Sequence, residues 1–157
     1  MTDDNYILRE AKKEDVPTLL AFEQAIIKVE RPFDPTIKPD PVSYYDIASY
    51  VTDPDVGVYV IEYQGEVVSS GYAKPHAARS YLDHEQYAHL GFMYTTEAHR
   101  GKGLNQRIVD ALIQWAKEHD LIEVRLTVYD DNTPAIRAYE KVGMKKHIIE
   151  MRTRISD

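Results

Sequence analysis

The chain has 157 residues, no cysteine and a formal net charge of −7, and 43% of its residues are hydrophobic. This length and composition predict one globular domain over residues 1–157 with a sizeable core. The lack of cysteine excludes disulfides, thiolate metal sites and cysteine nucleophiles. The acidic balance argues against nucleic acid and anionic membranes as partners, because both bind basic surfaces.

No apolar run is long enough to span a bilayer. The acidic start, MTDDNYILRE, lacks the pattern of a secretory leader, so we expect a cytoplasmic protein. The negative charge would suit a cationic or amine-bearing partner, although acidity that only maintains solubility would look the same. A homodimer is compatible with this composition, which does not decide the oligomeric state.

The first third of the chain predicts one strand and two helices. Tyr6–Arg9 is rich in strand-forming residues, and Asp15 and Pro17 then mark the start of a helix over Val16–Val29. Residues 30–41 hold four prolines and predict a shaped surface loop. A second helix is expected over Val42–Val51.

The middle of the chain predicts a β-hairpin, a loop and a further strand. The alternating runs Val56–Tyr63 and Glu66–Ala73 flank a Gln-Gly turn, which is typical of a hairpin. Residues 74–86 read as a loop into which the second hairpin strand could extend. In the next strand, Tyr87–Thr95, alternation puts two sets of residues on opposite faces. Tyr87, His89, Gly91 and Met93 form one set, and Ala88, Leu90, Phe92 and Tyr94 the other.

The last third predicts two helices and two strands. One helix begins after Gly103 and ends near His119, with an apolar stripe at Leu104, Ile108, Leu112 and Trp115. Residues 124–129 alternate as a strand, a helix follows Pro134, and residues 145–152 form the last expected strand. The order β-α-α-β-β-β-α-β-α-β indicates a mixed α/β sandwich.

The stretch Leu90–Asn105, LGFMYTTEAHRGKGLN, predicts a strand, a glycine turn and a helix start. Free N–H groups and the positive end of the helix dipole make such a junction an anion site. Neither GxGxxG nor a Walker A pattern is present, so this glycine turn is neither a dinucleotide-binding fingerprint nor a P-loop.

Two motifs in this order make the chain resemble the GCN5-related N-acetyltransferase (GNAT) superfamily. Arg100 and Gly103 match Q/R-x-x-G-x-G/A, and Asn105 stands where the pattern has glycine or alanine. A second motif, N-x-x-A-x-x-x-Y-x-K-x-G-F, is met by Asn132, Ala135, Tyr139, Lys141 and Gly143, with Met144 in place of phenylalanine. The resemblance implies a mostly antiparallel sheet with helices on both faces.

The resemblance also implies acetyl-CoA as co-substrate, with no metal. Backbone N–H groups of the glycine turn would hold the pyrophosphate, and the strand edge would pair with the pantetheine amides. The residues expected to bind it are Met93, Tyr94, Thr95, Arg100, Gly101, Lys102, Gly103, Leu104, Asn105, Asn132 and Tyr139.

Catalysis would need an acid for the departing thiolate and a base for the amine. Tyr139 matches the family's acid position, and we favour this role over the alternative, an aromatic residue that packs a helix face against the sheet. Some relatives have a glutamate as base early on this strand, but Tyr87 stands at that position here. His89, two residues on, is therefore the candidate base, with Glu85 and ordered water as alternatives.

The expected function is transfer of an acetyl group to a primary amine of a small molecule. The candidates for the acceptor wall are Glu30, Asp34, Tyr44, Tyr45 and Tyr72, an acidic and aromatic set that would suit a cationic amine. A protein or peptide N-acetyltransferase and a non-catalytic acyl-CoA sensor are the alternatives.

Overall fold

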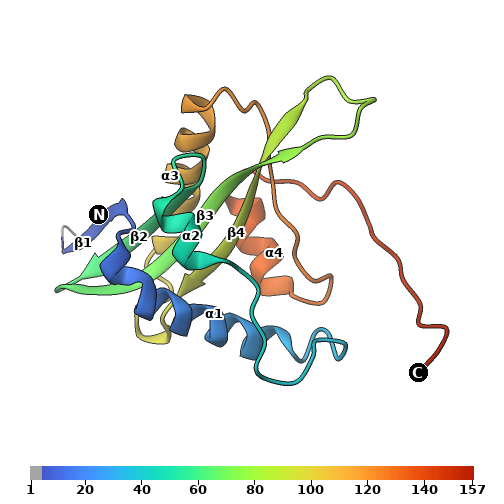
Figure 1. Cartoon of the computed structure of the whole chain (residues 1–157), viewed down its shortest axis with the longest axis horizontal. Helices are drawn as coiled ribbons and strands as arrows, with labels where there is room; N and C mark the ends of the chain where they lie inside the picture. The colour runs from blue at the N-terminus through green and yellow to red at the C-terminus, as the bar shows by residue number, and fades with distance from the viewer. Residues whose placement is uncertain (1–4) are drawn as a thin grey trace.

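A five-stranded sheet lies at the centre of the computed structural model, which describes residues 5–157 (Figure 1). Residues 1–4 of the acidic start lie outside this range. The strands, in spatial order, are β1 (Tyr6–Glu10), β2 (Gly57–Tyr63), β3 (Glu66–Ala77), β4 (Gln86–Thr95) and β5 (Val124–Arg125). The first four pair antiparallel, whereas β5 pairs parallel with β4. The expected mixed, mostly antiparallel sheet is confirmed.

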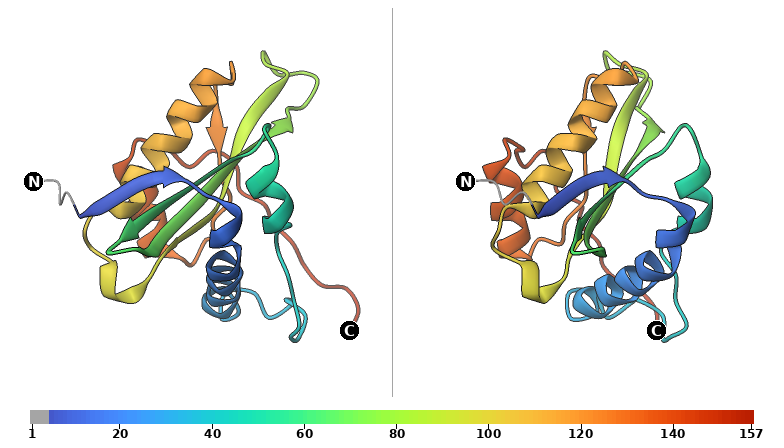
Figure 2. Two further views of the ribbon diagram at one scale, coloured as in Figure 1. Left: turned by 60° about the vertical axis from the view of Figure 1, so that its left-hand side comes forward. Right: turned by 90° about the vertical axis from the view of Figure 1, so that its left-hand side faces the viewer.

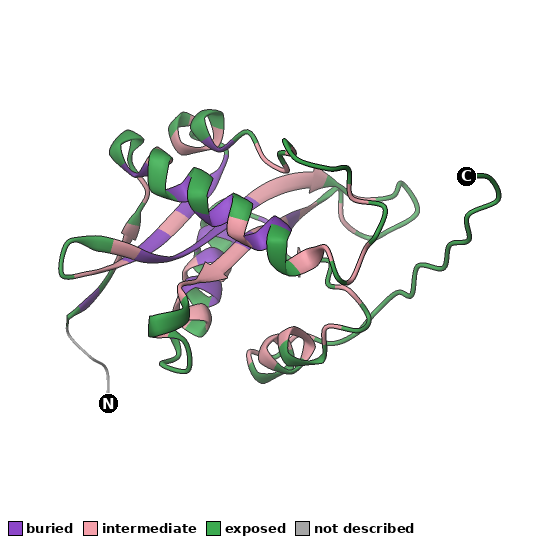
Figure 3. Cartoon of the chain, turned by 90° about the horizontal axis from the view of Figure 1, so that it is seen from below, coloured by how far each residue is buried: buried purple, intermediate pink, exposed green. Residues whose placement is uncertain are grey.

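Helices cover both faces of this sheet, as the two views of Figure 2 show. A 3₁₀ turn, η1 (Lys13–Asp15), leads into α1 (Val16–Glu30), which lies with α2 (Ile47–Thr52) on one face. The other face carries α3 (Leu104–Glu118) and α4 (Thr133–Lys141). Figure 3 shows that the buried residues lie along the sheet and the inward sides of the helices.

The helix patterns explain which side chains form the two cores. The four stripe residues of α3 are at most 4% exposed and pack on β2, β3 and β4. On the other face α1 contributes an apolar cluster that meets α2 and β2. Its members include Leu19, Phe22 and Ile26.

A β-bulge in β4 changes which residues share a face. Ser70 pairs with Tyr94 and Tyr72 pairs with Gly91, so β4 has one more residue than β3 between these points. Phe92 takes up the difference with a left-handed φ of 59°. The alternation expected along β4 is therefore wrong beyond Gly91.

The bulge leaves Phe92 in the α1–α2 core and turns Met93 to the α3 side. Ala88 and Leu90 also face α3, whereas Tyr94 joins Phe92 on the opposite face. The two faces of β4 thus exchange their occupants at the bulge, which the even alternation of the sequence did not indicate.

Two further boundaries differ from expectation because of the hydrogen bonds that their residues make. The second helix begins at Ile47 instead of Val42, because the N–H groups of Tyr44 and Tyr45 donate to the Glu23 carboxylate, not to a helix. β3 continues to Ala77 because it still pairs with β4 there.

The two C-terminal strands depart most from the expected pattern. The strand expected over residues 124–129 keeps only Val124–Arg125, where it pairs with β4. Residues 145–152 have no strand partner in the described chain, so the expected last strand is absent. A strand needs a neighbour to bond with, whatever its side-chain pattern.

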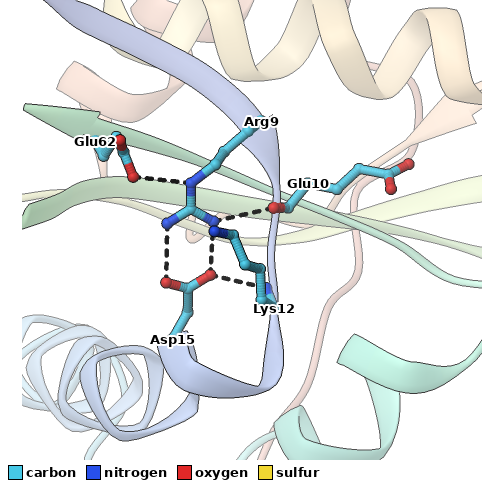
Figure 4. A network of polar contacts seen from close by, with 5 residues as sticks. All are labelled: Arg9, Glu10, Lys12, Asp15 and Glu62. Atoms are coloured by element: carbon cyan, nitrogen blue, oxygen red, sulfur yellow. Dashed lines mark hydrogen bonds and ion pairs between the residues drawn. The ribbon is translucent and has the colours of Figure 1, made fainter. Parts of the chain in front are cut away.

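A charged network ties the start of α1 to the sheet (Figure 4). The Arg9 guanidinium donates to both carboxylate oxygens of Asp15, at 2.7 and 3.0 Å, and to Glu62 at 2.8 Å. Asp15 also accepts from the Lys12 N–H at 2.8 Å and its side chain is only 9% exposed. Because Arg9 stabilises the carboxylate, the pKa of Asp15 lies below its usual value of 3.8.

We expect Asp15→Asn to lower the free energy of unfolding at pH 7 by about 1–3 kcal/mol, because a charge-assisted pair is lost. The Asp15 contribution is fully present above its unfolded pKa of about 3.9 and is lost as the pH falls through the lower folded pKa. Urea denaturation between pH 7 and pH 3 measures both effects. The exposed Asp110→Asn is the control, and equal loss in both variants would contradict the assigned role.

Candidate active site

A cleft of about 260 Å³ opens between the end of β4, the start of α3 and one side of α4. It lies where β4 and β5 part, because β5 pairs with β4 only at Ala88 and His89. Its lining residues are Met93, Tyr94, Thr95, His99, Arg100, Gly101, Gly103, Leu104, Asn105, Ala135, Ala138 and Tyr139.

The glycine turn forms one end of the cleft. Gly101 and Gly103 both have φ of 76°, a region that suits glycine, and Gly103 is the residue that caps α3. Among residues 5–157, no hydrogen bond occupies the N–H groups of Gly101, Lys102 and Gly103. These donors and the first turn of α3 therefore offer a site for a phosphate group.

The two basic side chains of this turn behave differently. The Arg100 Nε donates to the Thr95 carbonyl at 3.0 Å, which holds the guanidinium near the end of β4 and 5.9 Å from the Tyr94 ring centre. Lys102 is exposed and does not line the cleft. Arg100 is thus fixed in position, whereas Lys102 contributes its charge from outside.

The β4 bulge forms one wall and is held by two buried serines of β3. The Ser70 hydroxyl donates to the Phe92 carbonyl, and the Ser69 hydroxyl to the Tyr94 carbonyl, both at 3.0 Å. Both serines are 1% exposed. They bond to carbonyls at the bulge and just after it, while the β5-facing edge at residues 90–95 has no strand neighbour.

The opposite wall comes from α4. Ala135 and Ala138 line it with small side chains, and Tyr139 packs partly against the α3 core. Burial, assisted by the charge of Glu30, raises the pKa of Tyr139 to about 12, so its hydroxyl stays protonated near neutral pH. Asn132 instead accepts a hydrogen bond from the Ala135 N–H at 3.3 Å and caps α4.

A buried carboxylate of α1 positions the aromatic residues on the α1–α2 face. Glu23 is 2% exposed, and its Oε2 accepts from the N–H groups of Tyr44 at 2.9 Å and Tyr45 at 2.7 Å. The Tyr45 ring then meets Tyr72 and Phe92, with ring centres 5.5 and 5.4 Å apart. Glu23 thus fixes the two expected wall residues against β3 and the bulge.

Two acidic residues at the end of α1 face the same region. Burial raises the pKa of Glu30, and the negative charge of Asp34 adds to this, while a hydrogen bond with Tyr44 lowers it. Hydrogen bonds from Thr36 and Arg152 hold the pKa of Asp34 well below its usual range. Asp34 also accepts from the Tyr129 hydroxyl at 3.3 Å. Glu30 is the less stabilised of the two anions.

His89 lies on the α2 side of the sheet and does not line the cleft. Its ring stacks on His76 with centres 4.6 Å apart and lies 6.1 Å from the Tyr72 ring centre. Burial, with the nearby His76 and Lys74, lowers the pKa of His89, so the imidazole is neutral near pH 7. Tyr87 lies under the Arg125 guanidinium, at 4.2 Å, and Glu85 is exposed.

The structure therefore gathers nine of the expected binding residues on the cleft and leaves Lys102 and Asn132 off it. It also adds His99, which is not among the binding residues expected from the sequence. His99 accepts or donates at Tyr6 Oη, 2.8 Å away, and so fixes the loop before the glycines. Glu23 was missed too, although a carboxylate inside the apolar stripe of α1 was a visible signal.

The chain matches the family model described as the Acetyltransferase (GNAT) family over residues 23–144. The chain belongs to this family. An N-alpha-acetyltransferase of the archaeon Sulfurisphaera tokodaii is 28% identical over 148 residues, which are 90% of this chain and 81% of that protein. The chain is accordingly an acetyltransferase of the GNAT superfamily.

Solved structures agree with this fold. The BH1408 protein of Bacillus halodurans, as a tetramutant, superposes with a TM-score of 0.80 at 21% identity, covering 95% of this chain and 99% of that chain. A protein described as a predicted acetyltransferase of Clostridium acetobutylicum, solved with acetyl-CoA, gives 0.70 at 17% identity, covering 96% of each. No helix in the described part of the chain is long and apolar enough to cross a membrane.

We expect Glu23→Gln to raise the KM for the acceptor several-fold and leave acetyl-CoA affinity unchanged, because it weakens the anchor of residues 43–45, which all donate to Glu23. Steady-state kinetics with varied acceptor, and calorimetric titration with acetyl-CoA, separate the two effects. Glu14→Gln, on the exposed 3₁₀ turn before α1, is the matched control. A parallel loss of acetyl-CoA affinity would show that Glu23 supports the whole fold instead.

Proposed function

We propose that this acetyltransferase moves an acetyl group from acetyl-CoA to a primary amine of a small molecule. One observation carries the proposal. A single cleft combines free N–H donors at a helix start, an unpaired strand edge and a protonated tyrosine. These are the three kinds of group that a pyrophosphate, a pantetheine chain and a departing thiolate each require. The cytoplasmic location expected from the sequence stays a prediction.

The residues present fit acetyl-CoA. The N–H groups from Gly101 to Asn105 would bind the pyrophosphate, and Arg100 would add positive charge beside it. Backbone groups of β4 at Met93, Tyr94 and Thr95 would pair with the pantetheine amides as a neighbouring strand does. Asn105 lines the cleft as a small polar residue, so its departure from glycine or alanine is compatible with binding.

The bound thioester would supply an electrophilic carbonyl, and the chain's own groups would manage the protons. Tyr139, kept protonated by burial, would donate its hydroxyl proton to the departing sulfur. The N–H groups beside the bulge, at Met93 or Tyr94, would donate to the carbonyl oxygen. The amine must arrive neutral, so a group that accepts its proton must face the α1–α2 side.

Two residues are candidates to receive that proton. His89 remains the base that the sequence predicts, and its lowered pKa keeps it neutral and able to accept. Glu30 is the other, because its carboxylate is near enough to Tyr139 to raise the pKa of that hydroxyl. Its negative charge, together with Asp34 and the tyrosine rings, would attract an ammonium group.

A protein or peptide N-terminus is the second candidate acceptor, because the Sulfurisphaera relative is named an N-alpha-acetyltransferase. A thiol-release assay with acetyl-CoA distinguishes the candidates. Polyamines, amino acids and aminoglycosides form one arm, and peptides with free or blocked N-termini the other. Release with small amines alone supports the proposal, and release only with free N-terminal peptides replaces it. Tight acetyl-CoA binding without release in any arm would support the sensor alternative.

We expect Tyr139→Phe to lower kcat by roughly 100-fold or more, the usual size of a general acid's contribution, while acetyl-CoA affinity stays nearly constant. Tyr59→Phe is the control, because burial also raises the pKa of Tyr59 but that residue lies outside the cleft. Thiol release and calorimetric titration provide the two measurements. An unchanged kcat in Tyr139→Phe would refute the acid role.

We expect Gly103→Val to abolish acetyl-CoA binding, because the new side chain would enter the open space in front of the free N–H groups. No atom lies within 4 Å of a Cβ built at Gly103, and the same holds for Gly65, which has φ of 82° in the β2–β3 turn. Gly65→Val therefore imposes similar backbone strain away from the cleft. Thermal denaturation should show similar losses in both variants, whereas only Gly103→Val should lose binding. Retained binding would contradict the pyrophosphate assignment.

A further inference from the structure

The outer halves of β3 and β4 carry a cluster of basic side chains beside α2. Lys74 pairs with His89 and His76 pairs with Tyr87, and residues directly opposite in a sheet share a face. The Lys74 ammonium lies 4.9 Å from the centre of the Tyr50 ring of α2, so this is the face that α1 and α2 cover. Both strands extend past α2 in Figure 1, and the three basic side chains are only partly buried.

No carboxylate neutralises this cluster within the described chain. Among residues 5–157, no ion pair includes Lys74, His76 or His89. Arg125, the next cation on this face, differs because Glu123 binds it at 2.8 Å. Burial lowers the pKa of both histidines, and the positive charge of Lys74 lowers both further. An anion bound among the three side chains would relieve this repulsion.

A row of tyrosine rings connects the basic cluster with the acidic end of the candidate site. Its members, in order, are Tyr44, Tyr45, Tyr72 and Tyr50. The centres of neighbouring rings in this row are 5.3–5.7 Å apart. Glu30 lies at the first ring, to which it is hydrogen-bonded, and Lys74 lies over the last. The row therefore has a negative group at one end and a positive group at the other.

We propose, granted the acetyl transfer to an amine described above, that Lys74 and His76 bind an anionic group of the acceptor. The substrate is then an amine that also carries a carboxylate or a phosphate. Its ammonium group would approach at Glu30, and its anionic group would lie at the basic cluster, so each end meets the opposite charge. A polyamine has no group that suits the basic end, and Lys74 would repel it.

Matched pairs of acceptors test this subsite through thiol release from acetyl-CoA. One arm compares ω-amino acids of several chain lengths with their amides, and the other compares aminoalkyl phosphates with the matching amino alcohols. We expect the KM of the anionic member to be about tenfold lower, the usual contribution of a hydrogen bond between charged groups. The arm with the larger ratio identifies the anionic group. Equal KM values within every pair would overturn the subsite and leave the proposed function intact.

Two substitutions at Lys74 separate binding of the anion from packing on Tyr50. Lys74→Gln should reduce the KM ratio within a pair to about one, because the charge is lost. Lys74→Arg keeps the charge and the contact with the ring, and should preserve the ratio. Lys117→Gln, at an exposed lysine of α3, makes the same change in net charge and should also preserve it. An equal rise of KM for both members of each pair in Lys74→Gln would show a structural role alone and would contradict the subsite.

Sulfate binding gives a readout that does not require turnover. CoA is first added to saturation, so that the glycine turn is occupied, and sulfate is then titrated while NMR follows the imidazole signals. We expect saturable shifts at His76 and His89, which Lys74→Gln should remove. Equal, non-saturable shifts of all six histidines would show an adventitious ion only and would overturn the subsite. Saturable binding without acetylation of any amine would refute the proposed function while supporting the anion site.

Discussion

The bulge at Phe92 is the constraint on which the candidate site depends. One extra residue in β4 turns Met93 toward α3 and leaves Phe92 on the α1–α2 face, so the strand contributes to both cores within two residues. Beyond this point β4 follows a path on which β5 no longer pairs with it, and the cleft opens there. The hydroxyls of Ser69 and Ser70 stabilise the irregularity, because each is buried and donates a hydrogen bond to a carbonyl at or next to the bulge. An open strand edge is thus produced by a local irregularity in the pairing, which two small polar side chains hold in place.

The positive and negative groups of the candidate site lie at different ends. At the glycine turn, N–H donors, the α3 dipole and Arg100 all favour an anion. At the end of α1, Glu30 and Asp34 lie among tyrosines and favour a cation. Tyr139 stands between the two ends, since it lines the cleft and its pKa responds to Glu30. Because Asp34 is already neutralised by Arg152 and two hydroxyl donors, Glu30 is the carboxylate with charge left to offer a substrate. Under the proposed function, an ammonium group would approach from the Glu30 end and the phosphate would lie at the glycine turn.

The anion end could be predicted from the sequence because its determinants are local. Gly101 and Gly103 allow the left-handed backbone conformation of the turn, and the apolar stripe of α3 indicates where the helix starts. The local sequence is therefore enough to predict the geometry of this end. The acceptor end depends on contacts between distant segments. Glu23 pulls Tyr44 and Tyr45 out of the helix expected over Val42–Val51, through bonds across about twenty residues that no periodic pattern records. The bulge is similar, because even alternation along residues 87–95 gives no sign of the extra residue, although Gly91 marks a place where irregularity is cheap.

The two expected C-terminal strands show a second limit of predicting strands from alternating hydrophobicity. Residues 124–129 and 145–152 both alternate as strands do, yet one is mostly unpaired and the other entirely so. Alternation describes what a segment could bury, whereas a strand exists only when a neighbour supplies its hydrogen bonds.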